Sequence, residues 1–326
     1  MAAKNILITG CAGFIGSCLA KNLLFDGFNV VGLDNYDSFY SRGIKELRIN
    51  DLKGYSNFSF FEEDVLKIHE VLNPQDIDVC IHLAAKAGVL HSVKNPFSYF
   101  HNNVNSTTHL LNFLSLNKHI KFLMGSSSSI YDDGNHDMNL FKEDFTPIRP
   151  MSPYSHTKYI CEQICDVWHQ NSSMDILKLR FFSVYGCQMR PDLAIYKFSR
   201  QILEGKTITL FGDGRSRRDY THIDDIVDGI NLAVKYSLDN EAINESFNLG
   251  NANPVELSEL IKLLSEIFQI PARVNHDNSF SEEMTFTGAH LEKSRKILGY
   301  HPKYNLREGL LSMSEWLAQN PYGTTY

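Results

Sequence analysis

The chain has 326 residues, of which 43% are hydrophobic and 21% are charged, a composition typical of a folded globular protein and not of a disordered or fibrous one. Its formal net charge of −7 argues against nucleic-acid binding, which usually needs a dense basic face. No stretch approaches the roughly 20 apolar residues that a membrane-spanning helix needs, so we predict no membrane association.

The first predicted elements form a βαβ unit. Residues 4–9 (KNILIT) are typical of a short buried strand, 14–25 carry apolar residues at helical spacing, and 29–33 (NVVGL) indicate a second strand. Strand, helix and strand within about thirty residues is the unit from which parallel sheets are built.

The same alternation continues to about residue 180, so we predict a Rossmann-type, doubly wound α/β domain over residues 1–180. Further strands are expected at 58–61, 79–83, 121–124 and 176–181, and further helices at 103–114 and 155–169.

Beyond residue 180 the pattern loosens. A turn rich in Gly and Arg (GDGRSRRD, 212–219) is followed later by an amphipathic helix at 257–268. We predict that residues 181–326 form mainly a smaller C-terminal substrate-binding domain. The chain is expected to return to the first domain around 222–250, with a strand near 246–250.

Cysteine and histidine usage gives no metal motif. The six cysteines include no CxxC pair, and Cys161 and Cys165 lack a second pair that would complete a zinc site. The 13 histidines include no HExxH motif. We therefore predict no metal and reduced thiols, as in a cytoplasmic protein. Gly10, Gly13 and Gly16 interrupt the apolar N-terminus, which argues against a secretory signal peptide.

The same three glycines lie between the strand and the helix of the βαβ unit. Glycines there allow a tight turn, close approach of a pyrophosphate and exposure of helix N–H groups to its charge. Asp34 ends the second strand, where a carboxylate can accept hydrogen bonds from ribose hydroxyls and repels a 2′-phosphate. The pattern predicts NAD as the cofactor in preference to NADP.

The GxxGxxG spacing resembles the short-chain dehydrogenase/reductase superfamily, which implies a Tyr-xxx-Lys pair and an upstream Ser or Thr. Tyr154, Lys158 and Ser127 match this set. One helical turn separates Tyr154 from Lys158, so both point to the same side. A phenol ionises only well above neutral pH, and a neighbouring ammonium and the positive nicotinamide favour the phenolate. Tyr154 can then take a proton from a sugar hydroxyl as hydride leaves the same carbon.

Other motifs resemble the extended, epimerase/dehydratase branch of this superfamily and follow in its order: Asp64-Val65, His82-Leu-Ala-Ala, Asn103 in NNVNST, Arg180 in LRFFSVYG, and RRDYTHIDD at 217–225. The resemblance implies a nucleotide-sugar substrate, with Arg218 at its phosphate, and a homodimer formed through helices at 103–116 and 155–169. It also implies a set of cofactor contacts: Gly10, Gly13, Phe14, Ile15, Gly16, Asp34, Asn35, Asp64, Val65, Leu83, Ala84, Ala85, Lys86, Asn103, Tyr154 and Lys158.

The residues after Ser127 bear on the reaction type. Dehydratases and UDP-glucuronate decarboxylases of this branch place an acid there, whereas this chain has Ser128 and Ser129, which favours simple 4-epimerisation through a transient 4-keto sugar. Segments 34–48, 83–89, 180–198 and 202–230 resemble the UDP-glucuronate 4-epimerases. That resemblance implies interconversion of UDP-glucuronic and UDP-galacturonic acid, with Ser127 and Ser128 on the sugar and Ser183 and Arg190 on its carboxylate.

Three positions depart from the family pattern. Leu90 stands where the uronate epimerases often have Arg, Asp132 where glycine usually follows the tyrosine, and Cys187 where proline is common. Because Leu90 removes a possible anion contact, a 4-epimerase of UDP-glucose or of UDP-N-acetylhexosamines stays open.

Two further alternatives concern individual residues. Arg190 has a second interpretation, as a surface residue that pairs with Asp192. A catalytically silent NAD-binding regulator is also conceivable on this fold, but such proteins usually lose the Tyr or the Lys, and this chain keeps Tyr154 and Lys158 along with Ser127.

Overall fold

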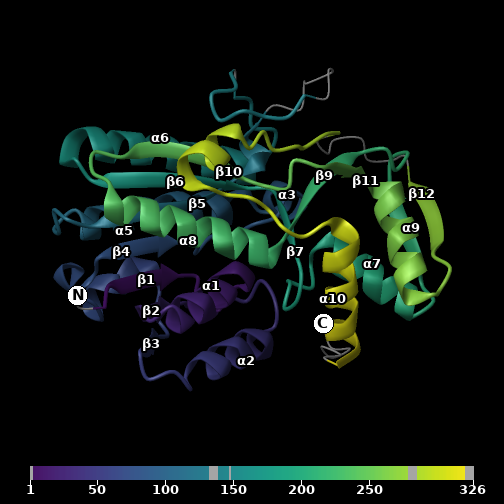
Figure 1. Ribbon diagram of the computed structural model, residues 1–326, viewed down its shortest axis with the longest axis horizontal. Coiled ribbons are helices and arrows are strands. Elements are labelled where there is room, and N and C mark those ends of the chain that lie inside the picture. Colours follow the sequence, from purple (N-terminus) through teal and green to yellow (C-terminus); the bar gives the residue numbers. More distant parts are fainter. Residues whose placement is uncertain (1–2, 132–138, 147, 278–284, 320–326) are drawn as a thin grey trace.

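The computed structural model describes residues 3–131, 139–146, 148–277 and 285–319. Its centre is a seven-stranded sheet in the order β10–β6–β5–β4–β1–β2–β3, and all neighbouring strands in it are parallel (Figure 1). The order reverses between β1 and β4, which is the switch point where such sheets bind ligands. The predicted Rossmann-type sheet is therefore confirmed. Its strands are β1 (Asn5–Thr9), β2 (Asn29–Leu33), β3 (Phe58–Phe61), β4 (Val79–His82), β5 (Lys121–Ser127), β6 (Asp175–Phe181) and β10 (Asn244–Leu249).

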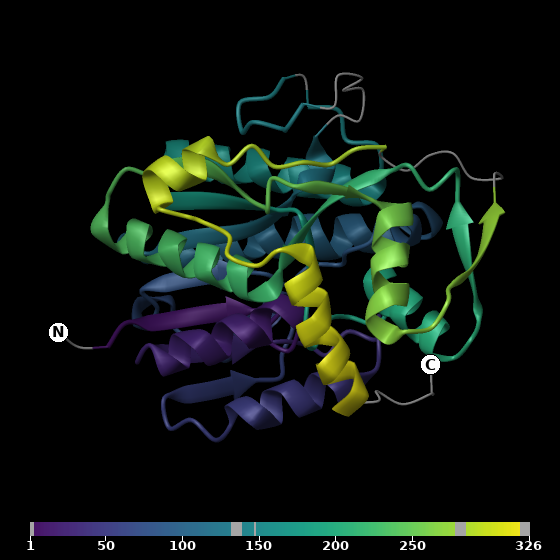
Figure 2. The same cartoon turned by 45° about the vertical axis from the view of Figure 1, so that its right-hand side comes forward.

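Alternating side chains of the strands feed two cores, one on each face of the sheet. In β1, Ile6 and Ile8 pack on one face and Leu7 packs on the other. The first face is covered by α1 (Phe14–Phe25), α2 (Arg42–Leu52) and α8 (Ile223–Asp239), of which α1 and α8 lie side by side in Figures 1 and 2. The second face is covered by η1 (Val65–Glu70), η3 (Phe100–Asn105), α5 (Ser106–Leu114) and α6 (Pro153–Ser172). Helices α3 (Val89–Lys94) and α4 (Pro96–Tyr99) pack against α6, and the short helix η2 (Pro74–Asp76) precedes β4.

Strand β5 and helix α6 extend beyond their predicted limits, the strand through pairing with β6 and the helix through a local cap at its N-terminus. Strand β5 runs on to Ser127 because Gly125, Ser126 and Ser127 stay in register with β6. Short 3-10 helix η4 (Ser128–Ile130) follows. Helix α6 begins at Pro153 because Ser152 forms a reciprocal capping box with Ser155 and proline suits the first helical position.

The rest of the chain forms a second lobe beside the carboxyl ends of the large sheet (Figure 2). It contains a three-stranded sheet in the order β11–β9–β7 and a separate parallel pair, β8 with β12. Its elements are β7 (Ser183–Tyr185), α7 (Ala194–Leu203), β8 (Thr207–Phe211), β9 (Arg217–His222), β11 (Pro254–Glu256), α9 (Leu257–Phe268), β12 (Arg273–Asp277) and α10 (Leu306–Gln319). The short helix η5 (Ser294–Leu298) lies instead against α8 and β10 of the large sheet.

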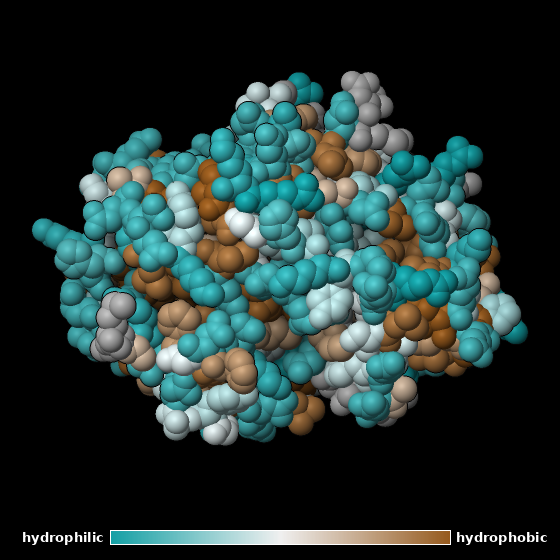
Figure 3. Space-filling view, in the orientation of Figure 1, coloured by the Kyte–Doolittle hydropathy of each residue, from teal (hydrophilic) through white to brown (hydrophobic). Residues whose placement is uncertain are grey.

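The surface drawn in Figure 3 is mainly hydrophilic, with separate small hydrophobic areas. In the part of the chain that the structure describes, no helix combines the length and the apolar character needed to cross a membrane. Those residues also contain no group of three or more His, Cys, Asp and Glu side chains arranged to hold a metal ion.

Candidate active site

A cavity of about 1040 Å³ lies at the carboxyl ends of the central strands and continues between the large sheet and the second lobe. Its walls come from the loops after β1, β2, β4 and β5 on one side. On the other side they come from the segment after β7, from β8 and from β9. Open parallel sheets bind their ligands at this edge.

The glycine-rich loop forms one end of the cavity, and its backbone leaves no room for a Cβ at Gly10 or Gly16. Gly10 has a φ of +75°, and a Cβ there would lie 2.7 Å from the backbone nitrogen of Ala84. A Cβ on Gly16 would lie 2.3 Å from the carbonyl oxygen of Gly10. No side chain caps the first turn of α1, so its N–H groups stay available to an anion.

Acidic and amide side chains follow at the tips of β2 and β3. The Asp34 carboxylate accepts hydrogen bonds from the backbone N–H groups of Ala12 (3.1 Å) and Tyr36 (2.8 Å). Burial raises the pKa of Asp34, although Lys45 and the two N–H groups act in the opposite direction. The Asn35 amide donates to Asp64 at 2.7 Å, which ties the two tips together.

Ser127, Tyr154 and Lys158 all line the cavity. Ser127 ends β5, while Tyr154 and Lys158 lie on successive turns of α6. The Lys158 ammonium is buried and donates to the carbonyl oxygen of Gly125 at 2.7 Å. The half-buried Tyr154 ring packs edge to face against Tyr99, with 6.2 Å between ring centroids.

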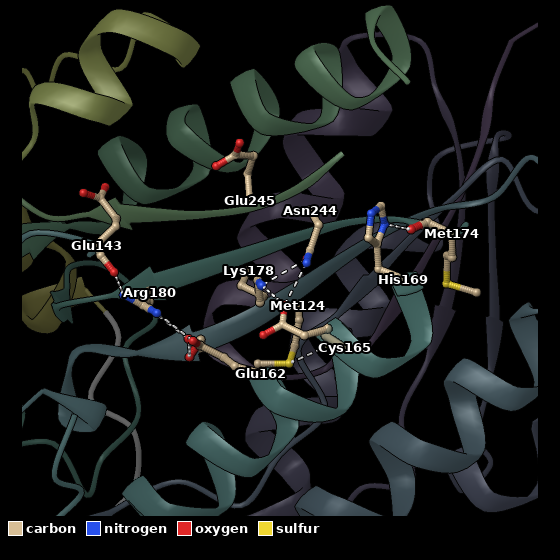
Figure 4. Close-up of polar contacts among 12 residues, drawn as sticks. Met124, Glu143, Glu162, Cys165, His169, Met174, Lys178, Arg180, Asn244 and Glu245 are labelled. Carbon is tan, nitrogen blue, oxygen red and sulfur yellow. Dashed lines mark hydrogen bonds and ion pairs between the residues drawn. The ribbon is translucent and has the colours of Figure 1, made fainter. Parts of the chain in front are cut away.

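A buried ion pair fixes α6 against the sheet (Figure 4). Glu162, one turn after Lys158, binds Arg180 through two hydrogen bonds of 2.7 and 3.0 Å and accepts a third, of 2.6 Å, from Ser126. Both side chains are almost fully buried, so removing either partner would leave an uncompensated charge. Because Ser126 precedes Ser127, this pair also sets the position of α6 relative to the end of β5.

Arg190 follows β7, and the structure shows the Asp192 pair of its second interpretation, although the side chain is mostly buried and does not lie on the surface. Its side chain lines the cavity, and it also binds Asp192 through two hydrogen bonds of 2.9 and 2.6 Å. The guanidinium stacks over the Phe39 ring at 5.2 Å. Burial disfavours its charge, but the ion pair with Asp192 outweighs burial and raises the pKa of Arg190.

Twenty of the 21 site residues predicted from the sequence line this cavity, Ser128, Ser183 and Arg218 among them. Asn103 is the exception. Its buried side chain exchanges two hydrogen bonds with the backbone of Lys86 (2.8 and 3.0 Å) and donates to Thr157 at 2.9 Å. Asn103 therefore lies behind the cavity wall and holds the segment after β4 against α6.

The positions that depart from the family pattern lie in different surroundings. Leu90 lines the cavity. Cys187 does not, and its sulfur lies 3.7 Å from the Ser312 hydroxyl of α10. Asp132 is outside the described residues. Sequence reasoning missed Phe39 and Tyr40, which also line the cavity. Their signal was the match of segment 34–48, which gave a resemblance but no role to its aromatic residues.

Comparison with known proteins agrees with this geometry. The model of the "NAD dependent epimerase/dehydratase family" matches residues 6–250. The chain belongs to this family. It is 35% identical to the UDP-glucuronate 4-epimerase of Thermodesulfobacterium geofontis over 96% of each protein.

Solved structures of the epimerase/dehydratase family superpose on nearly the whole chain. The UDP-glucuronic acid 4-epimerase of Bacillus cereus, in complex with UDP-glucuronic acid and NAD, gives a TM-score of 0.90 at 36% identity, covering 97% of this chain and 99% of that one. The UDP-glucose 4-epimerase of Thermotoga maritima, with UDP-glucose, gives 0.83 at 27% identity, with coverage of 97% and 99%.

Proposed function

We propose that the chain is an NAD-dependent 4-epimerase that interconverts UDP-glucuronic acid and UDP-galacturonic acid. The observation that carries the proposal is a single cavity that brings Ser127, Tyr154 and Lys158 between a dinucleotide-type glycine loop and Arg190. Two relatives named for UDP-glucuronate, at 35% and 36% identity, support the same substrate, and two named for UDP-glucose have lower identities of 32% and 27%.

The residues at the glycine-rich end fit an NAD molecule. Gly10 and Gly16 leave no space for a Cβ, which suits close approach of a pyrophosphate to the backbone. Asp34, at the tip of β2, would accept hydrogen bonds from the adenosine ribose, and its carboxylate disfavours the 2′-phosphate of NADP. When bound, NAD supplies the acceptor and donor for the hydride at C4 of the sugar.

In the proposed reaction Tyr154 removes the proton of the C4 hydroxyl and later returns a proton to the C4 carbonyl oxygen. Ser127 donates a hydrogen bond to the same oxygen, and the Lys158 charge stabilises the phenolate. Between the two proton transfers the 4-keto sugar turns over in the cavity.

With a uronic acid as substrate, Arg190 would also protect the 4-keto intermediate from loss of CO2. Oxidation at C4 creates a β-keto acid, which loses CO2 when its C5–C6 bond aligns with the π system of the carbonyl. A carboxylate held by Arg190 and Ser183 out of that alignment is protected. The pair with Asp192 engages the Nε and one Nη of Arg190 and leaves the other Nη for the substrate.

The proposal is tested by proton NMR of the purified protein with UDP-glucuronic acid, first without and then with added NAD. Formation of UDP-galacturonic acid supports it, and conversion without added NAD indicates that the cofactor stays bound during purification. Absence of conversion under both conditions contradicts it.

A 4-epimerase of neutral or N-acetylated UDP-sugars is the second candidate. It is favoured by Leu90, which replaces a cation in the cavity wall, and by Asp192, which already balances the Arg190 charge. The same NMR assay with UDP-glucose and UDP-N-acetylglucosamine distinguishes the two. Turnover of these sugars without turnover of the uronate would keep the mechanism and remove the role given to Arg190.

We also propose that the enzyme is a cytoplasmic homodimer. Large apolar side chains are exposed on neighbouring elements of the α6 face, including Val93 (58%), Phe97 (88%), Leu116 (67%) and Val167 (51%). Light scattering coupled to size exclusion measures the mass in solution, and a monomer at micromolar concentration would contradict the proposal. Substituting Phe97 by Glu should shift a dimer toward monomer.

A further inference from the structure

Segment 34–48 contains a buried cation that the proposed chemistry does not use. Arg48, on α2, is only 2% exposed although it lies outside the substrate cavity. Its guanidinium makes three hydrogen bonds, to the carbonyl oxygens of Ala12 (3.0 Å) and Gln188 (2.5 Å) and to the Tyr40 hydroxyl (2.7 Å). These acceptors come from three separate segments, each of which borders the active site.

The bond to Ala12 acts on the glycine-rich loop. Ala12 lies between Gly10 and Gly16, and its N–H donates to Asp34 while its carbonyl oxygen accepts from Arg48. Both hydrogen-bonding groups of this residue are therefore held by buried, oppositely charged side chains. The loop conformation that leaves the backbone open to a pyrophosphate depends on this pair of contacts.

The bond to Gln188 acts on the segment that carries Arg190. Gln188 has a φ of +62°, a left-handed conformation that a residue with a side chain adopts only at a cost. Its carbonyl oxygen, two residues before Arg190, is held by Arg48 in that conformation. The bond to Tyr40 adds a contact next to Phe39, whose ring supports the Arg190 guanidinium.

From these contacts we infer that Arg48 is a positioning residue that couples the cofactor loop to the Arg190 segment. The part of this inference that concerns Arg190 rests on the proposed function. The part that concerns the cofactor rests on the geometry of the glycine-rich loop. Arg48 is not among the residues that line the substrate cavity. It sets the backbone on which one ligand lies and the arginine that holds the carboxylate of the other.

The test compares Arg48→Met with Arg42→Met. Methionine keeps the length and apolar stem of Arg48 but donates no hydrogen bond. Arg42 is a matched control because it lies on the same helix and forms ion pairs with Glu46 and Glu62, but its side chain is 53% exposed. Loss of the hydrogen bonds to buried carbonyl oxygens should weaken NAD retention about tenfold, measured as NAD released from the denatured purified protein. Arg42→Met should retain NAD as the native protein does.

A second readout separates loosened positioning from partial unfolding. When the carboxylate is held less firmly, the C5–C6 bond of the 4-keto sugar breaks more often. The electron pair stays at C5, conjugated with the C4 carbonyl, until C5 is protonated, and CO2 leaves. Arg48→Met should therefore raise KM for UDP-glucuronate about tenfold and increase severalfold the CO2 released per epimerisation from carboxyl-labelled substrate. A smaller folded fraction would lower kcat but would leave KM and the CO2 released per epimerisation unchanged.

Arg48→Lys provides a variant that keeps the charge and most of the volume but cannot spread its donors over three acceptors. It should fall between the native protein and Arg48→Met, and it carries the test if Arg48→Met does not fold. If the folded variants retain NAD as the native protein does and keep its KM and its CO2 released per epimerisation, the inference is wrong. If the native protein does not turn over UDP-glucuronate, the proposed substrate is wrong. NAD retention then still tests whether Arg48 holds the glycine-rich loop.

Discussion

The two ends of the active-site cavity are constructed differently. The cofactor end consists mainly of backbone and buried short side chains: Gly10 and Gly16 are confined by neighbouring main-chain atoms, and Asp34 is fixed by two N–H groups. The substrate end consists of long side chains on the second lobe, of which Arg190 is held by Asp192 and Phe39. One end is fixed by sterics and the other by paired charges.

The difference indicates which changes each end tolerates. A new Cβ at the cofactor end collides with backbone, and the only relief is a shift of the loop itself. At the substrate end a side chain can be exchanged while the backbone stays, so substrate choice can change without loss of the fold. We expect changes at the cofactor end and at the catalytic centre to affect every substrate, and changes at the substrate end to discriminate among them.

The largest effect is expected at the centre, where the two ends meet. Tyr154→Phe removes the proton acceptor and keeps the ring contact with Tyr99, so turnover should fall about a thousandfold while NAD is retained. Turnover is measured by NMR and NAD by its release on denaturation. Tyr159→Phe, on the same helix, is the control and should stay active. Full activity of Tyr154→Phe would exclude the acid–base role.

Arg190→Met tests the charge pairing at the substrate end. It should raise KM for UDP-glucuronate about a hundredfold and change KM for UDP-glucose, if that sugar is turned over, less than about threefold. Because the single change leaves Asp192 without its partner, the double variant Arg190→Met with Asp192→Asn is the matched control. Equal effects on both sugars would argue against a carboxylate contact.

Gly10→Ala tests the steric fit at the cofactor end. The new Cβ would approach the Ala84 nitrogen to 2.7 Å, so NAD retention should fall about tenfold for any sugar substrate. Gly205→Ala is the control, because Gly205 also has a positive φ, of +63°, but nothing within 4 Å of its Cβ position. If both variants lose the cofactor equally, backbone strain and not crowding is responsible.

The smallest effect is expected on the free energy of unfolding at acid pH, where His82 contributes to the loss of stability. Burial, and then the charge of Lys158, lowers the pKa of His82 to about 3 from 6.5. Below pH 6.5 the unfolded chain binds a proton that the folded one does not, so stability is lost as pH falls, at up to about 1.4 kcal/mol per pH unit. His82→Asn should flatten this slope in thermal melts, whereas substitution of the exposed His301 should not. Burial also lowers the pKa of His222, which therefore accounts for part of the remaining slope of stability against pH.

Much of the fold followed from local pattern. The limits of β2, β3, α1 and α9 agree with their predicted ranges to the residue, because apolar periodicity and adjacent turns define them. The glycine loop followed from its place between the first strand and the first helix. Gly10 and Asp34 were predictable for the same reason, since each lies at the end of a strand, whereas Tyr154 and Lys158 were found through the resemblance of their Tyr-xxx-Lys spacing to a family motif.

The sequence by itself thus determined the sheet, the cofactor loop and the Tyr–Lys pair, all of which depend on spacing within short segments. Only the tertiary structure decided that Arg190 would rest on Phe39 and that Asn103 would lie behind the cavity. It also decided that Arg48 would reach a carbonyl 140 positions away. These contacts join distant segments, and burial and charge pairing select them only after the chain has packed.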